Sequence, residues 1–233
     1  MEPIIKRPRS IIPACDVSID IYKKIVKETS SIDGVGAYKI GFQLALTHGL
    51  PKIVEITRKY TDKPIIYDHQ KAATDIPDTG IKFMGTLKNA GVDAVILFPQ
   101  SGPETQKAWI DAALKKKLGV IVGGLMTHPM YVRSEGGYIN DESIKEIYLN
   151  AANQGVVDFV VPGNKPEFIK EIRELLESKG IKPIFYSPGF IAQGGSISEA
   201  TKVVGSKWHA IIGRGIYEAE DIKKATLEYT SQI

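Results

Sequence analysis

Cysteine is nearly absent from this 233-residue chain, which has only Cys15. A single thiol cannot form an internal disulfide, and proteins without disulfides are typical of the reducing interior of the cell. The sequence also lacks an apolar run of about 18 residues and a long apolar segment at its N-terminus, so we expect neither a membrane span nor an export signal. These absences predict a soluble, cytoplasmic protein.

Charge of one sign is scarce as well. The 30 Lys and Arg residues are interspersed with 27 Asp and Glu residues, which gives a net charge of only +3. Without a sustained basic stripe we expect no nucleic-acid partner. Linkers rich in Pro, Gly or Ser are missing too, while 43% of the residues are hydrophobic, enough for one large core. We therefore expect a single domain over residues 1–233.

What the sequence does have is a regular alternation of two patterns. Short apolar runs rich in Val, Ile and Tyr, which predict β-strands, alternate with longer segments of helical periodicity. The predicted strands cover residues 11–16, 37–41, 64–68, 93–98, 119–126, 158–162, 182–187 and 209–213. The predicted helices cover residues 19–29, 50–60, 81–90, 104–117, 141–154, 166–179 and 218–230.

This alternation predicts a parallel sheet covered by helices, because near-continuous apolar strands are typical of sheets buried on both faces. Eight such units in 233 residues favour a closed α/β barrel, the (β/α)8 or TIM barrel. An open, doubly wound sheet is the alternative. However, no G-x-G-x-x-G motif follows the first predicted strand, so the fingerprint of a dinucleotide-binding sheet is missing.

Charged residues stand at or just after the ends of several predicted strands. In TIM barrels these strand ends and the loops that follow them carry the chemistry. A single charge at a strand end can be merely solvated, but acids and lysines that converge on one rim indicate a site. The residues are Asp16, Lys39, Asp68, Lys71, Asp75 and Arg214.

Two glycine-rich segments follow the seventh and eighth predicted strands. The first reads Ser-Pro-Gly-Phe-Ile-Ala-Gln-Gly-Gly over 187–195, and the second reads Ile-Gly-Arg-Gly over 212–215. Glycines let backbone N–H groups approach an anion, and Arg214 offers a planar set of donors. Predicted helix starts at Ser196 and near Tyr217 add favourable dipoles. The two segments predict a phosphate-binding site.

Taken in order, the motifs of nearly the whole chain resemble the orotidine 5′-monophosphate decarboxylase family. The most specific match is S-P-G-x-x-A-Q-G-G at 187–195, paired with Ile-Gly-Arg at 212–214. The other matches are Ala-Cys-Asp-Val at 14–17, Tyr-Lys-Ile-Gly at 38–41, Asp-Ile-Pro-Asp-Thr at 75–79, Met-Thr-His-Pro at 126–129 and Val-Pro-Gly-Asn-Lys-Pro-Glu at 161–167.

The resemblance implies a carboxy-lyase of pyrimidine biosynthesis that converts orotidine 5′-phosphate (OMP) to UMP and CO2 with no cofactor and no metal. It implies that Lys71 donates the proton and that Asp68 lies near the substrate carboxylate. Asp75 would reach the site of a neighbouring subunit in a homodimer. The implied substrate-binding residues are Asp16 and Lys39 near the ribose, Thr127 and Gln193 near the base, Gln193 and Arg214 at the phosphate, and in addition Ile76, Thr79, Pro162 and Gly213.

The chain departs from the family's pattern at two places. The family's catalytic motif D-x-K-x-x-D puts its first acid and its lysine on one face of a strand. Here Lys71 follows Asp68 by three residues, and Gln70 occupies the expected lysine position. A β-bulge or an early turn after Asp68 would restore the convergence, and bulges are common beside active sites. The second departure is Phe98, where the family commonly has histidine.

These departures leave two alternatives open. One is another lyase of the same superfamily that acts on a sugar phosphate with Mg2+, and the other is a non-catalytic protein that binds a nucleotide or phosphate ligand. The loops around Thr127 and Gln193 favour a nucleotide. His69 and His128 lack the H-x-x-H spacing of metal ligands, so we expect no metal.

Overall fold

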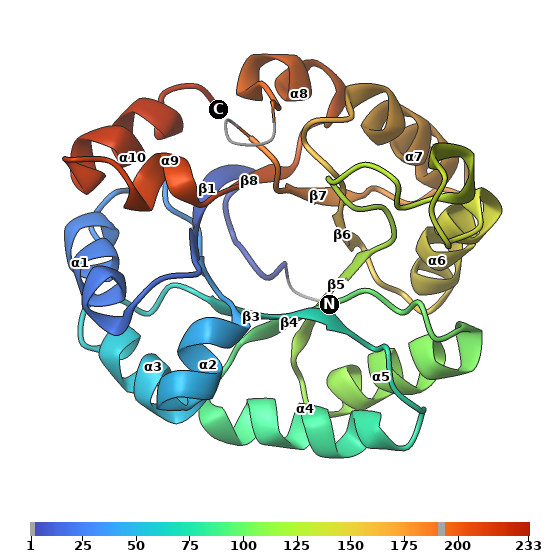
Figure 1. Ribbon diagram of the computed structural model, residues 1–233, viewed down its shortest axis with the longest axis horizontal. Helices are drawn as coiled ribbons and strands as arrows, with labels where there is room; N and C mark the ends of the chain where they lie inside the picture. The colour runs from blue at the N-terminus through green and yellow to red at the C-terminus, as the bar shows by residue number, and fades with distance from the viewer. Residues whose placement is uncertain (1–2, 191–193) are drawn as a thin grey trace.

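The computed structural model describes residues 3–190 and 194–233. Within them, eight parallel strands close into a barrel in the order β1 to β8, and helices surround it (Figure 1). The strands are β1 (Arg9–Cys15), β2 (Tyr38–Ile40), β3 (Ile65–Ala72), β4 (Ala94–Leu97), β5 (Gly119–Gly123), β6 (Asp158–Val160), β7 (Ile184–Ser187) and β8 (Trp208–Ile212). The helices are α1 (Ile19–Thr29), α2 (Phe42–His48), α3 (Leu50–Arg58), α4 (Thr79–Ala90), α5 (Pro103–Lys115), α6 (Asp141–Asn153), α7 (Pro166–Ser178), α8 (Ile197–Val203), α9 (Arg214–Tyr217) and α10 (Ile222–Thr230), with a 3-10 turn at Arg133–Glu135. The predicted TIM barrel is confirmed.

The burial of the strands and helices explains why this sequence closes into a barrel. Every residue of β4 and of β7 is buried, so both faces of these strands need cover. Helix α7 supplies such cover with Ile169, Ile172 and Leu176, which are buried and spaced three and four residues apart. One face of each strand thus packs against helices, and the other fills the barrel.

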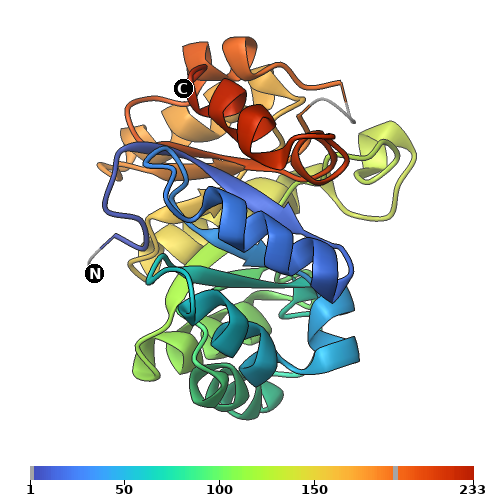
Figure 2. The same cartoon turned by 90° about the vertical axis from the view of Figure 1, so that its left-hand side faces the viewer.

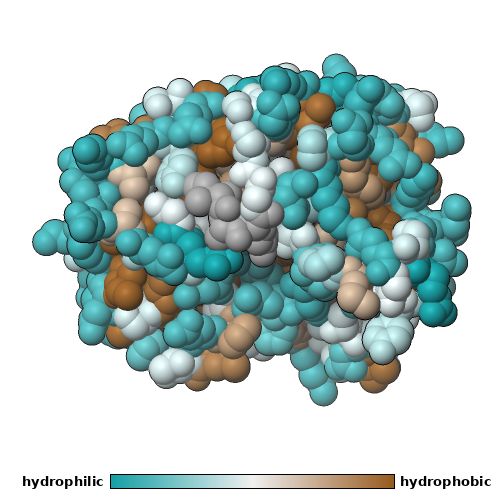
Figure 3. Space-filling model, turned by 45° about the horizontal axis from the view of Figure 1, so that its top comes forward, coloured by the Kyte–Doolittle hydropathy of each residue, from teal (hydrophilic) through white to brown (hydrophobic). Residues whose placement is uncertain are grey.

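The two ends of the barrel differ in what they carry. Figure 2 shows the N-terminal segment at one end and the long connection from β5 to α6 projecting from the other. Most of the face seen in Figure 3 is hydrophilic, and its hydrophobic residues lie in several separate places. None of the described helices is long and apolar enough to cross a membrane.

The sequence pattern does not predict two of the short helices. In α2, Phe42 and Leu46 are exposed, so the apolar residues form no buried stripe that would indicate a helix. Helix α9 is a single turn, too short for a periodic signal. The helix predicted over 218–230 begins only at Ile222, because the side chain of Asp221 accepts a hydrogen bond from the backbone of Lys224 and caps it.

Strand β3 contains the irregularity that the Asp68–Lys71 spacing predicts. It leaves the regular ladder with β4 after Asp68 and rejoins it at Ala72. Within this bulge Gln70 has φ 55° and Lys71 has φ 100°, both in the left-handed region. Such conformations cost non-glycine residues of order 1–3 kcal/mol each and persist where surrounding contacts compensate. Of the two possibilities that the sequence leaves open after Asp68, a bulge or an early turn, the structure has the bulge.

Four polar side chains are buried within the barrel, toward the N-terminal ends of the strands. Ser10 Oγ lies 2.8 Å from His209 Nδ1, and the hydroxyl of Tyr186 donates to Oδ1 of Asp158 at 2.9 Å. Burial lowers the pKa of His209 to about 3 and raises the pKa of Asp158 to about 6. Both shifts favour the neutral side chain, as burial does for unpaired ionisable groups.

Candidate active site

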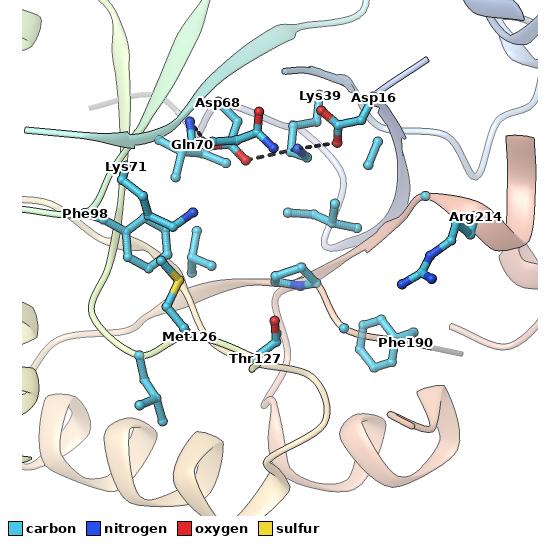
Figure 4. Close-up of a pocket in the computed structure, with 18 of the residues that line it drawn as sticks. Asp16, Lys39, Asp68, Gln70, Lys71, Phe98, Met126, Thr127, Phe190 and Arg214 are labelled. Atoms are coloured by element: carbon cyan, nitrogen blue, oxygen red, sulfur yellow. Dashed lines mark hydrogen bonds and ion pairs between the residues drawn. The ribbon is translucent and has the colours of Figure 1, made fainter. Parts of the chain in front are cut away.

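A cavity of about 280 Å³ opens where the strands end (Figure 4). This is the end at which TIM barrels carry their sites, because the strand-to-helix loops gather there. Side chains from several strands and loops face the cavity. Its polar side chains are those of Asp16, Lys39, Asp68, Gln70, Lys71, Thr127, Arg214 and Tyr217, and Ile96, Phe98, Leu125, Met126, Phe190 and Ile211 are among its apolar ones.

Lys39 stands at the centre of a row of charges on one wall. Its Nζ lies 3.0 Å from Oδ2 of Asp68 and 3.4 Å from Oδ2 of Asp16. Burial disfavours the ammonium, but the two carboxylates outweigh burial and raise the pKa of Lys39. Burial also opposes ionisation of Asp68, yet Lys39 outweighs it and lowers the pKa of that carboxyl. Lys39 and Asp68 are therefore both ionised at neutral pH.

Gly41 allows the carboxylate of Asp16 to take this position. Oδ1 of Asp16 is buried and has no hydrogen-bond partner among the described residues. A Cβ atom at position 41 would lie 1.8 Å from that oxygen, far inside van der Waals contact. Any side chain larger than hydrogen at position 41 would displace Asp16 from Lys39.

The bulge in β3 places Lys71 in the same cavity as Asp68. Nζ of Lys71 lies 5.0 Å from the centre of the Phe98 ring, within the range of a cation–π interaction. In the part of the chain that the structure describes, Lys71 forms no ion pair. Burial lowers the pKa of Lys71, and the charge of Asp68 opposes this shift only in part. A partly desolvated ammonium without an ion-pair partner is a stronger acid than an ordinary lysine.

Phe98 owes its position to a glycine on the next strand. A Cβ atom at Gly123 would lie 2.4 Å from Cζ of Phe98, so the ring occupies the space that a side chain there would need. Phe98 is buried and lines the cavity beneath Lys71. The residue at which the chain departs from the family's histidine therefore forms part of the site.

Arg214 enters the cavity from the side opposite Lys71 (Figure 4). It is the first residue of α9, directly after Gly213, which also lines the cavity. Thr127 contributes to the lining from the loop after β5. Pro162 is buried after β6 and is not among the described residues that line the cavity. The predicted phosphate ligand Gln193 lies outside the described residues.

The segment that contains Asp75 lies apart from this cavity. Asp75 and Ile76 are exposed, and Thr79 begins α4. Two side chains of α5 hold the segment: Thr105 Oγ1 donates to the carbonyl of Asp75 at 2.9 Å, and Trp109 Nε1 donates to the carbonyl of Ile76 at 3.1 Å. A single chain therefore does not bring Asp75, Ile76 or Thr79 to the cavity.

Two cavity-lining aromatic residues have no role in the sequence-based prediction. Phe190 follows Gly189 in the predicted phosphate loop, and Tyr217 lies one helical turn after Arg214. The sequence indicates a helix start near Tyr217 but gives the residue itself no role in the site. A helix that starts at Arg214 would have placed Tyr217 on the same side as the arginine.

Comparison with known proteins gives a consistent result over most of the chain. Residues 11–229 match the sequence model of the Orotidine 5′-phosphate decarboxylase / HUMPS family. The orotidine 5′-phosphate decarboxylase of Methanosarcina mazei is 35% identical over 199 residues, which are 85% of this chain and 84% of that protein. The enzyme of the same name from Methanocaldococcus jannaschii is 33% identical over 212 residues, 90% of this chain and 91% of that protein.

Solved structures agree with this match. The crystal structure of orotidine 5′-monophosphate decarboxylase from Methanocaldococcus jannaschii, complexed with the inhibitor BMP, superposes with a TM-score of 0.83 at 30% identity and covers 97% of this chain and 99% of that chain. The corresponding structure from Pyrococcus horikoshii OT3 gives a TM-score of 0.77 at 26% identity, with 96% and 98% covered.

Proposed function

Because the chain belongs to the orotidine 5′-phosphate decarboxylase / HUMPS family, we propose that it is a carboxy-lyase that converts OMP to UMP and CO2 in pyrimidine biosynthesis. Relatives named orotidine 5′-phosphate decarboxylase are 30–35% identical to this chain, and the matched region covers most of each relative. The observation that carries the proposal is the bulge in β3, which puts the ammonium of Lys71 into the cavity that also contains Asp68 and Arg214.

Lys71 is the proton donor in this proposal. When the bond between C6 of the pyrimidine and the carboxyl carbon breaks, its electron pair stays on C6 and CO2 leaves. A nearby ammonium stabilises that developing negative charge and then transfers a proton from Nζ to C6, after which solvent reprotonates the amine. The lowered pKa of Lys71 favours this transfer because the ammonium gives up its proton more readily.

Asp68 takes a place beside the departing carboxylate. Its ion pair with Lys39 at 3.0 Å keeps it ionised, so a substrate carboxylate that lies next to it experiences like-charge repulsion. Loss of CO2 removes that repulsion. The charge of Asp68 thereby raises the free energy of the bound substrate relative to the transition state and lowers the barrier to decarboxylation.

The remaining cavity residues bind the substrate. Arg214 and Gly213 receive the 5′-phosphate together with Gln193, and Thr127 contacts the base. Phosphate contacts far from C6 contribute binding energy that orders the site around the reacting carbon. Lys39 and Asp16 lie between the two ends, beside the ribose.

Asp75, Ile76 and Thr79 act in the cavity of a second copy of the chain in a homodimer. This assignment is supported by the exposure of Asp75 and Ile76, and by the fact that none of the three is among the described residues that line the chain's own cavity. The homodimer, the substrate contact of Pro162 and the cytoplasmic location stay predictions.

The test compares substitutions of Lys71 with a matched surface lysine. Lys71→Ala should reduce decarboxylation of OMP, followed by ultraviolet absorbance, by about a thousandfold, the usual scale for loss of a general acid with its charge. UMP affinity, measured by calorimetry, should stay nearly unchanged. Lys71→Arg keeps the charge but cannot give up a proton at neutral pH, so it should be almost as inactive.

Lys52→Ala is the control, because Lys52 is an exposed residue of α3 that pairs with Glu55, one helical turn away. It should behave as the wild type. Undiminished turnover by Lys71→Ala would overturn the proposed function.

A further inference from the structure

The orientation of the Gln70 side chain follows from its hydrogen bonds. Its Oε1 accepts a hydrogen bond from the backbone N–H of Phe42 at 3.2 Å. Only the oxygen of a side-chain amide accepts hydrogen bonds, so this contact determines the positions of Oε1 and Nε2. The NH2 group must then point away from Phe42. Because Gln70 lines the cavity, Nε2 is a donor at the cavity wall.

Nε2 has no hydrogen-bond acceptor among the residues that the structure describes. Among residues 3–190 and 194–233 the hydrogen bonds of Gln70 are those of Oε1 and of its backbone N–H, which donates to Oδ1 of Asp68 at 2.9 Å. The backbone bond holds the left-handed residue in the bulge, and the Oε1 bond holds the side chain. The amide is therefore fixed in place with its donors unused, which is the arrangement expected of a group that binds a ligand.

The position of the amide indicates which part of the substrate it meets. Figure 4 shows Gln70 beside the row formed by Asp68, Lys39 and Asp16, with Lys71 at one end of the cavity and Arg214 at the opposite side. Gln70 also lies close to Asp16, because its Oε1 and the carboxylate of Asp16 both flank Gly41. A nucleotide with its base at Lys71 and its phosphate at Arg214 has its sugar between them.

The hydrogen-bonding groups of Asp16 and Gln70 suit a hydroxyl group as ligand. A sugar hydroxyl donates one hydrogen bond and accepts others, so it is satisfied by a carboxylate on one side and an amide NH2 on the other. A second carboxylate would leave the hydroxyl oxygen without a donor, whereas an amide N–H or an ammonium supplies one. Asp16 supplies the acceptor and Gln70 the neutral donor.

We infer that Gln70 is a further substrate-binding residue whose Nε2 donates a hydrogen bond to a ribose hydroxyl of the bound nucleotide. This inference rests on the proposed function, since it takes OMP and UMP as the ligands. It gives a role to the residue that stands where the family's spacing would place lysine. Lys71 then performs the proton transfer, and Gln70 takes part in recognition of the sugar.

The experiment couples a change in the protein to a change in the ligand. Affinities for UMP, 2′-deoxy-UMP and 3′-deoxy-UMP are measured by calorimetry for the wild type, Gln70→Glu and Gln70→Met. Gln70→Glu keeps an oxygen for the N–H of Phe42 but has no donor at neutral pH, whereas Gln70→Met has neither. Because the ratio of affinities for UMP and its deoxy analogues is compared, any uniform effect of the added charge cancels.

We expect the wild type to prefer UMP over at least one deoxy analogue and both variants to lose about fivefold to tenfold of that preference, the scale of one neutral hydrogen bond. Thermal unfolding of Gln70→Glu should match that of the wild type. A preference that persists in both variants, or that falls only in Gln70→Met, would overturn the inference, since Gln70 would then serve only to hold Phe42.

Failure of the proposed function looks different. In that case the wild type itself neither decarboxylates OMP nor binds UMP, and both conclusions fall together. If the wild type does both while the affinity ratio is insensitive to position 70, only the role of Gln70 falls.

Discussion

At the scale of single residues, the contact between Lys71 and Phe98 favours the protonated form of the proposed proton donor. Burial lowers the pKa of Lys71, while the face of the Phe98 ring, 5.0 Å from Nζ, favours the charged form. Such a contact contributes about 0.5–2 kcal/mol, depending on desolvation. The ring thus limits how far burial can lower the pKa of Lys71.

Replacing Phe98 with Leu should move the activity profile along the pH axis. Leucine keeps the apolar surroundings but has no π face, so the pKa of Lys71 should fall further. The alkaline limb of kcat/KM, where Lys71 loses its proton, should then shift to lower pH. Phe168→Leu, which removes a ring from α7 outside the cavity lining, serves as the control. An alkaline limb at the same pH in the leucine variant would contradict the role of the ring.

At the scale of elements, the segment after β3 depends on helix α5 for its position. Thr105, which is buried, holds the carbonyl of Asp75 through one hydrogen bond. If Asp75 acts in the site of a neighbouring subunit, that bond and the one from Trp109 to the carbonyl of Ile76 position a group for another chain. A change in α5 would then alter activity without touching the cavity of its own chain.

Thr105→Val tests this link because valine has nearly the same shape but no hydroxyl. Losing the bond should cost about 1 kcal/mol of unfolding free energy, and kcat/KM for OMP should fall severalfold as Asp75 loses its support. Urea denaturation and steady-state kinetics measure the two effects. Thr86→Val is the control, since Thr86 is exposed and its hydroxyl donates to the carbonyl of Lys82 within α4. Lower stability with unchanged kinetics would argue against Asp75 as a shared residue.

The barrel could be predicted from the sequence, but the bulge and the contacts around it could not. Apolar runs indicate strands locally, whereas the three-residue step from Asp68 to Lys71 is compatible with a bulge, with an early turn, or with side chains on opposite faces of a regular strand. The bond from Phe42 to Gln70 and the fit of Phe98 to Gly123 join neighbouring strands and their loops. They depend on register and side-chain volume, which no local pattern encodes.

At the scale of the whole molecule, two buried groups give the stability opposing dependences on pH. Asp158 has a folded-state pKa of about 6, above its ordinary 3.8, so its contribution is present at low pH and is lost as pH rises through 6. His209 has a folded-state pKa of about 3, below its ordinary 6.5, so its contribution is present above 6.5 and is lost as pH falls toward 3. Between pH 4 and 6 the two effects offset each other.

Asp158→Asn should remove the pH dependence of Asp158 and keep that of His209. Asparagine retains an oxygen for the hydroxyl of Tyr186 but does not ionise. Relative to the wild type, the free energy of unfolding of this variant should rise from pH 4 to pH 6 by up to about 3 kcal/mol and then level off. Urea unfolding from pH 4 to 7.5 measures this difference, with exposed Asp62→Asn as the control. Parallel pH curves for the variant and the wild type would contradict the burial effect at Asp158.

The fit of Phe98 against Gly123 also fixes the order in which this cavity can change during evolution. A side chain at position 123 collides with the ring, so it is tolerated only after position 98 has become smaller. A smaller residue at 98, in contrast, needs no earlier change at 123. A route that adds a side chain at position 123 therefore passes first through a variant in which Lys71 no longer contacts the Phe98 ring, and that intermediate must survive selection before the new side chain is gained.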